Sequence, residues 1–345
     1  MNPSELHTQA RFVISLDFEQ YWGMRDKWSL PECRDNLLGE RIVIPQILAL
    51  FREYDIHATW ATVGFLFFET KEQLLQALPK VKPDYANPNL SPYPHLSSIG
   101  SGEKDDPFHY APSLIEKILA TPHQEIGTHT FSHYYCLERG QDIRAFSADL
   151  DAVVTAAKRF GVTLRSLVFP KNQFNSDYLQ VCRDKGIMAY RGNENSWLHQ
   201  PRNSEQELPL RRILRLLDAY LNLSGHNGHC MSEIARQFPY NIPSSRFLRP
   251  HSRSLKAFEP LRLRRNLADM TYAARNNLVY HLWWHPHNFG TNLDANISFL
   301  RRILEHYVAL RDRMGMESMN MGEIAYHLWG QNHNGCYWRS GKQCQ

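Results

Sequence analysis

Two carboxylates lie at the end of the first apolar run of the chain, where both could contact the same ion or molecule. The run Arg11 to Asp17 (RFVISLD) has the composition of a strand and is followed by Phe18 and Glu19. Since side chains alternate along an extended strand, Asp17 and Glu19 project to the same side while Phe18 packs away. Two like charges placed so close disfavour each other unless a cation is present. The pair predicts either a cation site or a simpler arrangement, in which Asp17 caps the next element and Glu19 is exposed.

A second group, His129 and His133, follows directly after the segment Glu125 to Thr128. Histidines at this spacing lie on one face of a helical turn, so both imidazoles can reach a single ion. Combined with the acidic pair, they supply an oxygen and nitrogen ligand set for zinc or a similar divalent metal, with positions left open for water and substrate. We therefore expect a metal site made from these two parts of the chain.

A third group of histidines closes the last strand candidate, Leu278 to Trp284. His285 stands where that strand should end, which makes it the expected site residue. Pro286 disturbs the register, so His287 need not share the role of His285. A histidine this close to two tryptophans can equally be a packed, hydrogen-bonded residue of the core.

Short apolar segments that alternate with longer amphipathic ones must position these groups. The strand candidates are Arg11 to Asp17, His57 to Thr62, Glu125 to Thr128, Leu164 to Phe169, Gly186 to Tyr190 and Leu278 to Trp284. Helices are expected over Arg41 to Tyr54, over Phe146 to Phe160 with Ser147 as a possible cap, and over Ile297 to Met314. This order is typical of α/β proteins with a parallel sheet or barrel, whose sites lie at the C-terminal ends of the strands.

Two stretches interrupt the alternation. Pro79 to Pro112 holds seven prolines and is expected to be a long loop over a surface or a site mouth. Residues 201–276 carry thirteen Lys and Arg against six Asp and Glu, a net charge of +7 where the whole chain has +4. This stretch is either a solvated helical insertion with surface arginines or an electropositive wall facing an anionic group such as a phosphate. Nucleic acid is not expected as a partner, because no zinc finger, aromatic single-strand platform or helix-turn-helix pattern accompanies the arginines.

Composition narrows the class of protein further. The 345 residues are 43% hydrophobic and 21% charged, which excludes a wholly disordered or fibrous chain. No run approaches the roughly 20 apolar residues that span a bilayer. The start of the chain lacks a basic and then apolar leader, so a cytoplasmic location is expected. The six cysteines are scattered without a C-x-x-C pair and are expected to be free thiols: Cys33, Cys136, Cys182, Cys230, Cys336 and Cys344.

The order of these motifs resembles one known family. SLDFEQYW, GTHTFSH, the FPKNQF segment and LVYHLWWHPHNFG follow one another as in the polysaccharide deacetylase (NodB-homology) superfamily, in its Asp-x-Glu subgroup, among the glycoside hydrolase and deacetylase barrels. The resemblance covers about residues 11–313, with 201–276 as a basic, mainly helical insertion, and leaves 314–345 as a C-terminal extension packed on the barrel. It implies an α/β fold, a distorted barrel of about seven β/α units.

The resemblance also implies roles for the three groups. Asp17 would be the general base, Glu19, His129 and His133 the ligands of a divalent metal, most plausibly Zn²⁺, and His285 the general acid. The third motif of the family usually has Arg before Pro, whereas this chain has Phe169 before Pro170. The nearest cation that could orient the base is then Lys171.

Aromatic and polar residues beside the motifs are expected to contact a sugar. The candidates are Tyr21, Trp22, Tyr134, Pro170, Lys171, Trp284 and His287. Trp60 and Trp283 are more readily explained as core residues of a large barrel.

The expected function is metal-dependent hydrolysis of the acetamido group of an N-acetylated sugar. The basic stretch favours a phosphate-bearing or lipid-linked glycan precursor as the substrate. A C–N hydrolase of cyclic amides or ureides on the same fold is the nearest alternative. A catalytically inactive carbohydrate-binding protein is another, because the third motif is altered. The oligomeric state is not predicted.

Overall fold

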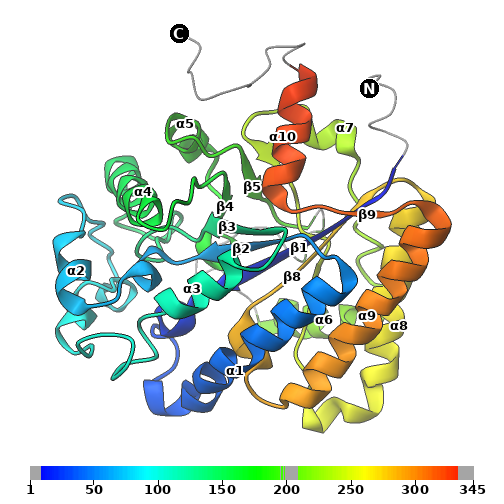
Figure 1. Cartoon of the computed structure of the whole chain (residues 1–345), viewed down its shortest axis with the longest axis horizontal. Helices are drawn as coiled ribbons and strands as arrows, with labels where there is room; N and C mark the ends of the chain where they lie inside the picture. Colours follow the sequence, from blue (N-terminus) through cyan, green and yellow to red (C-terminus); the bar gives the residue numbers. More distant parts are fainter. Residues whose placement is uncertain (1–8, 195, 197, 199–208, 333–345) are drawn as a thin grey trace.

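The computed structural model describes residues 9–194, 196, 198 and 209–332, and within them nine strands form one sheet (Figure 1). The strands are β1 (Arg11–Phe18), β2 (Ala58–Thr62), β3 (Gln124–Thr128), β4 (Ser166–Val168), β5 (Ala189–Arg191), β6 (Tyr240–Asn241), β7 (Arg246–Phe247), β8 (Val279–Trp284) and β9 (Glu317–Ser318). A strand lies at each of the six segments expected from the sequence, although β1 and β5 each end one residue later than expected, at Phe18 and Arg191, and β3 begins one residue earlier, at Gln124.

The sheet is parallel and curls into an incomplete barrel, as expected for the α/β class. Its strands follow the order β6-β5-β4-β3-β2-β1-β8-β7, and β9 pairs with the start of β1. Strands β6 and β7, which are consecutive in the chain, lie at the two edges, so residues 242–245 run from one edge to the other. Because all these strands run the same way, their C-terminal ends meet at one rim. Eight strands line this path, where about seven units were expected.

Helices surround the sheet in Figure 1. They are α1 (Leu30–Tyr54), α2 (Lys71–Gln76), α3 (Pro112–Leu119), α4 (Ile143–Lys158), α5 (Leu179–Asp184), α6 (Pro209–Asp218), α7 (Met231–Ile234), α8 (Glu259–Arg275), α9 (Leu293–Met314) and α10 (Met321–Asn332). The three expected helices are present. None of the described helices is long and apolar enough to cross a membrane.

All three helices start earlier than expected, and the starts of α1 and α4 have local reasons; α9 begins at Leu293 where Ile297 was expected. α1 begins at Leu30 because Ser29 and Glu32 form a capping box, in which each side chain bonds the backbone of the other residue. α4 is capped by Asp142, which accepts from the amides of Arg144 and Ala145, so Ser147 is not the cap. Gly161 follows α4 with a positive φ of 69°, the conformation that ends a helix at least cost for glycine.

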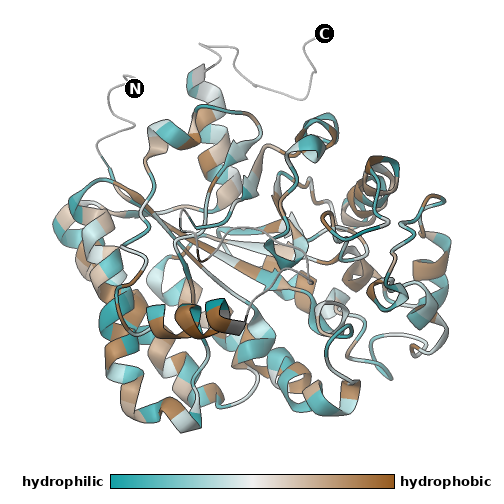
Figure 2. Ribbon diagram, turned by 180° about the vertical axis from the view of Figure 1, so that it is seen from behind, coloured by the Kyte–Doolittle hydropathy of each residue, from teal (hydrophilic) through white to brown (hydrophobic). Residues whose placement is uncertain are grey.

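The core lies on both faces of the sheet. All eight residues of β1 are buried, and the main apolar cluster joins the sheet to α1, α3, α4, α8 and α9. Figure 2 shows brown apolar stretches along the strands and along one side of most helices. A smaller cluster, which includes Val13, Ala61 and Val168, packs against α10. Helix α10 therefore packs against the sheet, and residues 333–345 lie outside the described part.

The basic stretch 201–276 forms part of the barrel framework and is not a solvated insertion. It contributes β6, β7 and α8 to the framework, although residues 201–208 lie outside the described part. Arg246, Arg262 and Arg265 are buried and paired with carboxylates, so they are not surface arginines. No local pattern marked β6 and β7 because each strand has only two residues.

The remaining expectations concern the loop and the thiols. Residues 79–111 form a long connection with two short 3₁₀ helices, Pro88–Leu90 and Pro94–Ser97, before α3. Cys33, Cys136, Cys182 and Cys230 are free, as expected, and Cys336 and Cys344 lie outside the described residues.

Candidate functional site

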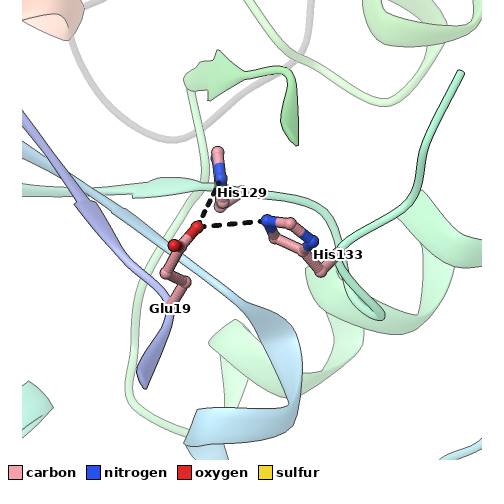
Figure 3. A group of neighbouring side chains, drawn as sticks. All are labelled: Glu19, His129 and His133. Carbon is pink, nitrogen blue, oxygen red and sulfur yellow. Dashed lines mark hydrogen bonds and ion pairs between the residues drawn. The ribbon is translucent and has the colours of Figure 1, made fainter. Parts of the chain in front are cut away.

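Three side chains converge at the C-terminal rim of the sheet, from the ends of β1 and β3 (Figure 3). Glu19 directly follows β1, and His129 and His133 follow β3. Glu19 Oε2 lies 3.3 Å from His129 Nε2 and 3.1 Å from His133 Nε2. All three side chains are buried. The structure thus brings the expected ligands together.

These three residues fit a tetrahedral metal ion. Ligand atoms held at about 2.0–2.2 Å from such an ion lie roughly 3.3–3.6 Å apart, close to the two separations observed. His129 Nδ1 donates to the carbonyl oxygen of Val168 at 2.8 Å, which leaves Nε2 as the nitrogen with a lone pair. That Nε2 is buried without a hydrogen-bond partner. Two histidines and one glutamate are a donor set that zinc uses in catalytic sites, with one position left for substrate or water.

The histidines meet through a loop, and not through the helical turn that their spacing indicated. Thr130 and His133 have positive φ values of 64° and 59°, which fold residues 129–133 back on themselves. Asp149 of α4 holds this loop, because its carboxylate accepts from the amides of Phe131 at 2.6 Å and Ser132 at 3.1 Å and from the hydroxyl of Ser132. Burial raises the pKa of Asp149 to about 6, although these hydrogen bonds oppose the rise.

Asp17 is held by an arginine that the sequence analysis did not identify. Arg191, at the end of β5, donates to both oxygens of Asp17 at 2.6 and 2.7 Å. The same guanidinium donates to Ser15 Oγ and to Asn172 Oδ1, each at 2.9 Å, and lies 4.1 Å from the ring centre of Trp283. Arg191 is fully enclosed by these partners, so the orientation of Asp17 is fixed.

Lys171, the cation expected to orient the base, lies elsewhere. Its ammonium group pairs with Asp26 and lies 4.1 Å from the ring centre of Tyr135. The third motif instead contributes Asn172, which bonds Arg191. The orienting cation is therefore supplied from β5, one strand beyond that motif.

His285 lies beside both carboxylates and is the most exposed of the converging side chains. Its Nε2 is 3.7 Å from Asp17 Oδ2 and 3.6 Å from Glu19 Oε1, and 23% of its side chain is exposed. His287 is buried, with its ring centre 5.0 Å from that of His285. Burial and the charge of His285 lower the pKa of His287 to about 3, so it is neutral and does not reach the solvent side of the site.

The charges of the site are mutually compensating. Burial alone would raise the pKa of Asp17, but the charges of Arg191, His129 and His285 more than offset it and the pKa is lowered. Burial likewise opposes the ionisation of Glu19, yet the charge of His285 and the close approach of His129 and His133 to its carboxylate bring its pKa well below the ordinary value. Both carboxylates are therefore ionised at neutral pH.

Most of the aromatic residues expected to contact a sugar belong to the core. Trp22, Tyr134 and Trp284 are buried in the main apolar cluster, as Trp60 is. Pro170 is also buried, and Trp283, expected in the core, is partly exposed and covers Arg191. Of the expected residues, Tyr21 lines a cleft of about 650 Å³ between residues 21–29 and 88–98.

Glu40 on α1 is a buried carboxyl group near the site that the sequence did not indicate. Both of its oxygens lack a hydrogen-bond partner. Burial, and then the charge of Glu19, raise its pKa well above the ordinary value, which favours the protonated, neutral form of Glu40.

Comparisons with known proteins agree with this architecture. Residues 35–190 match the family model described as polysaccharide deacetylase. A solved structure from Mycobacterium smegmatis, described as a polysaccharide deacetylase, aligns over 97% of this chain and 96% of its own, with 12% identity and a TM-score of 0.56. An allantoinase aligns over 96% of this chain and 93% of its own, with 12% identity and a TM-score of 0.51. At such identities these structures share the fold. A search of curated protein sequences found no match.

Proposed function

We propose that the chain is a metal-dependent N-deacetylase of an N-acetylated sugar, because residues 35–190 match the polysaccharide deacetylase family model, whose members hydrolyse non-peptide C–N bonds. The observation that carries the proposal is the convergence of Glu19, His129 and His133 beside an ionised Asp17 and a solvent-reachable His285. This arrangement puts three metal ligands, a base and an acid around one point.

We propose Zn²⁺ as the ion that these ligands would hold. When bound, such an ion acts as a Lewis acid and lowers the pKa of water towards roughly 7. Glu19, His129 and His133 would hold it. The remaining chemistry belongs to side chains of the chain itself.

Asp17 would accept the proton of the attacking water. Its two oxygens are fixed by Arg191, so the carboxylate cannot turn away, and its lowered pKa keeps it ready to accept a proton at neutral pH. His285 would donate a proton to the departing amine, because expulsion of an unprotonated amide ion is prohibitively slow. A general acid or base of this kind contributes roughly 10²–10⁴ in rate.

Arg191 also bears on the alternative of a catalytically inactive binding protein. That alternative arose because the third motif lacks its usual arginine. The pairing of Arg191 with Asp17 compensates for the loss and favours a working site. No observation favours the hydrolysis of cyclic amides or ureides over deacetylation.

The substrate class is proposed to be a phosphate-bearing or lipid-linked glycan precursor. The support is the net charge of +7 in residues 201–276. Phosphate groups would be drawn to such a region by long-range attraction.

Acetate release tests the proposal. The zinc-loaded protein should release acetate from members of a panel of N-acetyl sugars, nucleotide sugars and lipid-linked sugars, and Asp17→Asn should abolish that release while the protein keeps its fold and its metal. Ring opening of cyclic imides without any acetate release would favour the alternative enzyme. Binding of N-acetyl sugars that is equal in the parent and in Asp17→Asn, without turnover in either, would favour the binding protein.

A further inference from the structure

Helix α6 exposes its apolar face to solvent, unlike the usual surface helix of a globular protein. Leu210, Ile213 and Leu217 are 64%, 54% and 43% exposed, and their spacing puts them on one face. The charged side chains of Arg211 and Asp218 are buried instead. An amphipathic helix normally buries its apolar face. In Figure 2, α6 lies across the front of the molecule, with brown apolar segments in view.

A buried ion-pair network fixes this orientation. Asp218 accepts from the amides of Leu223 and Ser224 at 3.0 and 2.7 Å and pairs with Arg246 at 3.1 Å. Arg246 in turn donates to Asp269 of α8 at 2.6 Å. Turning α6 over would expose this network and leave buried charges without partners, which is strongly unfavourable. The apolar face is thus held outward by the fold.

The apolar surface extends beyond α6. Leu221 and Leu223, which follow the helix, are about half exposed, and so is Phe258 of the short 3₁₀ helix Arg253–Phe258. The ring centres of Tyr220 and Phe258 lie 6.2 Å apart, so the two segments are in contact. We call Leu210, Ile213, Leu217, Leu221, Leu223 and Phe258 the α6 surface.

The segment around the α6 surface is strongly basic. Residues 209–276 contain twelve Arg and Lys and four Asp and Glu. Three of the carboxylates, Asp218, Glu259 and Asp269, pair with Arg246, Arg262 and Arg265. Apart from these three pairs, the segment contains nine Arg and Lys and a single carboxylate, Glu233. Arg253 and Lys256 stand on the same 3₁₀ helix as Phe258.

The α6 surface is linked to the candidate site through two ring contacts and an electrostatic interaction. The ring of Phe247 lies 6.0 Å from that of His285, and the guanidinium of Arg249 lies 5.9 Å from the ring of Phe247. Arg249 also interacts electrostatically with Tyr220, which follows α6, and with Arg215 of α6. A large flat partner on the α6 surface would therefore lie close to the side of the site that carries His285.

We propose that the α6 surface docks the protein on an anionic lipid bilayer. Exposed aliphatic side chains accompanied by Arg and Lys have the composition of helices that lie in the membrane interface. A bilayer with anionic headgroups complements the excess positive charge. A second copy of the chain presents the same basic segment, and its like charges would oppose a symmetric pairing of the two faces. The α6 surface is an interfacial contact and not a spanning segment.

Vesicle flotation with the full chain tests the proposal. We expect the protein to float with vesicles of phosphatidylcholine and phosphatidylglycerol at low salt, to float less as salt rises, and to stay unbound with phosphatidylcholine alone. Ile213→Asp and, separately, Leu217→Asp should each weaken binding by about tenfold or more, since each removes one inserted side chain. Ile42→Asp on α1 is the matched control, because Ile42 is 58% exposed and of the same type, and it should bind as the parent does.

The outcomes separate the possible occupants of the surface. Equal loss of binding in Ile42→Asp and Ile213→Asp, or no binding to anionic vesicles by the folded parent, would overturn the proposal. A dimer in solution that Ile213→Asp converts to a monomer would assign the surface to a second copy instead. Circular dichroism checks that each variant is folded, and acetate release from a water-soluble substrate should be equal in all three variants, so a failure of docking is distinct from a failure of the proposed activity.

Discussion

Replacement of Arg191 by Gln tests how the base is held. The substitution removes two charge-assisted hydrogen bonds to Asp17, at 2.6 and 2.7 Å, each worth about 1.5–3 kcal/mol. Asp17 is left buried without its cation, a loss that costs about 3–5 kcal/mol unless the carboxyl group takes up a proton. A protonated Asp17 cannot act as a base. We therefore expect kcat/KM at neutral pH to fall by roughly 10²–10⁴.

The pH profile of kcat/KM distinguishes this cause from a general loss of structure. In the parent, the charge of Arg191 helps to lower the pKa of Asp17 against the effect of burial. Without Arg191 the effect of burial dominates, so the acidic limb of the profile should move to higher pH. Acetate release measured across pH, with metal content checked in each sample, provides the readout.

Lys171→Met is the matched control, because it removes the cation that the sequence analysis assigned to the same role. Lys171 pairs with Asp26 and does not contact Asp17. The variant should keep kcat/KM within about tenfold of the parent and leave the acidic limb in place. If Arg191→Gln were as active as the parent and Lys171→Met were inactive, the assignment of the orienting cation would be wrong.

Three further predictions follow from the same geometry. Asp149→Ala leaves three buried donors of the His129 to His133 loop without their acceptor. Metal affinity, measured by competition with a chelator, should therefore fall roughly 10–100-fold. Unchanged affinity would contradict the loop's dependence on Asp149. Glu40 binds a proton in the folded chain that the unfolded chain releases above about pH 4.3, so stability declines as pH rises beyond that value. Glu40→Gln removes this decline, and its Tm relative to the parent should therefore increase as pH rises above about 4.3 in thermal melts. A difference that stays constant with pH would refute the buried, neutral carboxyl group. His285→Gln should lower amide hydrolysis by roughly 10²–10⁴ at unchanged metal content but spare 4-nitrophenyl acetate, whose leaving group needs no proton; equal losses on both substrates would remove His285 as the acid.

The strands and the residues at their ends were predictable because the signal is local. β1, β3 and β8 are short strands with carboxylates or histidines at or just after their C-terminal ends, and a parallel sheet brings such ends to one rim. Nothing more than strand order was needed to expect Glu19 near His129. The start of α1 also had a readable signal, the capping box of Ser29 and Glu32, which was overlooked.

The orienting arginine was not predictable from local pattern. Arg191 ends a three-residue strand, and its partner Asp17 lies 174 positions away. A lone arginine after an apolar run is normally a sign that the strand has reached solvent. Its burial depends on Asp17, Ser15 and Asn172 meeting at the same point, which only the folded sheet specifies.

Which aromatic and charged side chains are exposed could also not be predicted from the sequence. Trp22 and Tyr134 follow the motifs closely, yet the loop of residues 79–111 covers the first and α4 packs against the second: Trp22 Nε1 donates to the carbonyl oxygen of His109, and Tyr134 contacts Phe146. The helix α6 shows the reverse case, since its apolar face is turned outward by an ion pair of Asp218. Both depend on tertiary partners that the local sequence does not reveal.

Metal analysis of the purified protein tests the central claim most directly. We expect about one zinc ion per chain, and we expect it to be lost in Glu19→Ala and in His133→Ala. His281→Ala is the control, because His281 is buried in β8 but bonds Ser15 and Ile242 instead of joining the three ligands. Full zinc content in both ligand variants, with the fold intact, would contradict the proposed metal site.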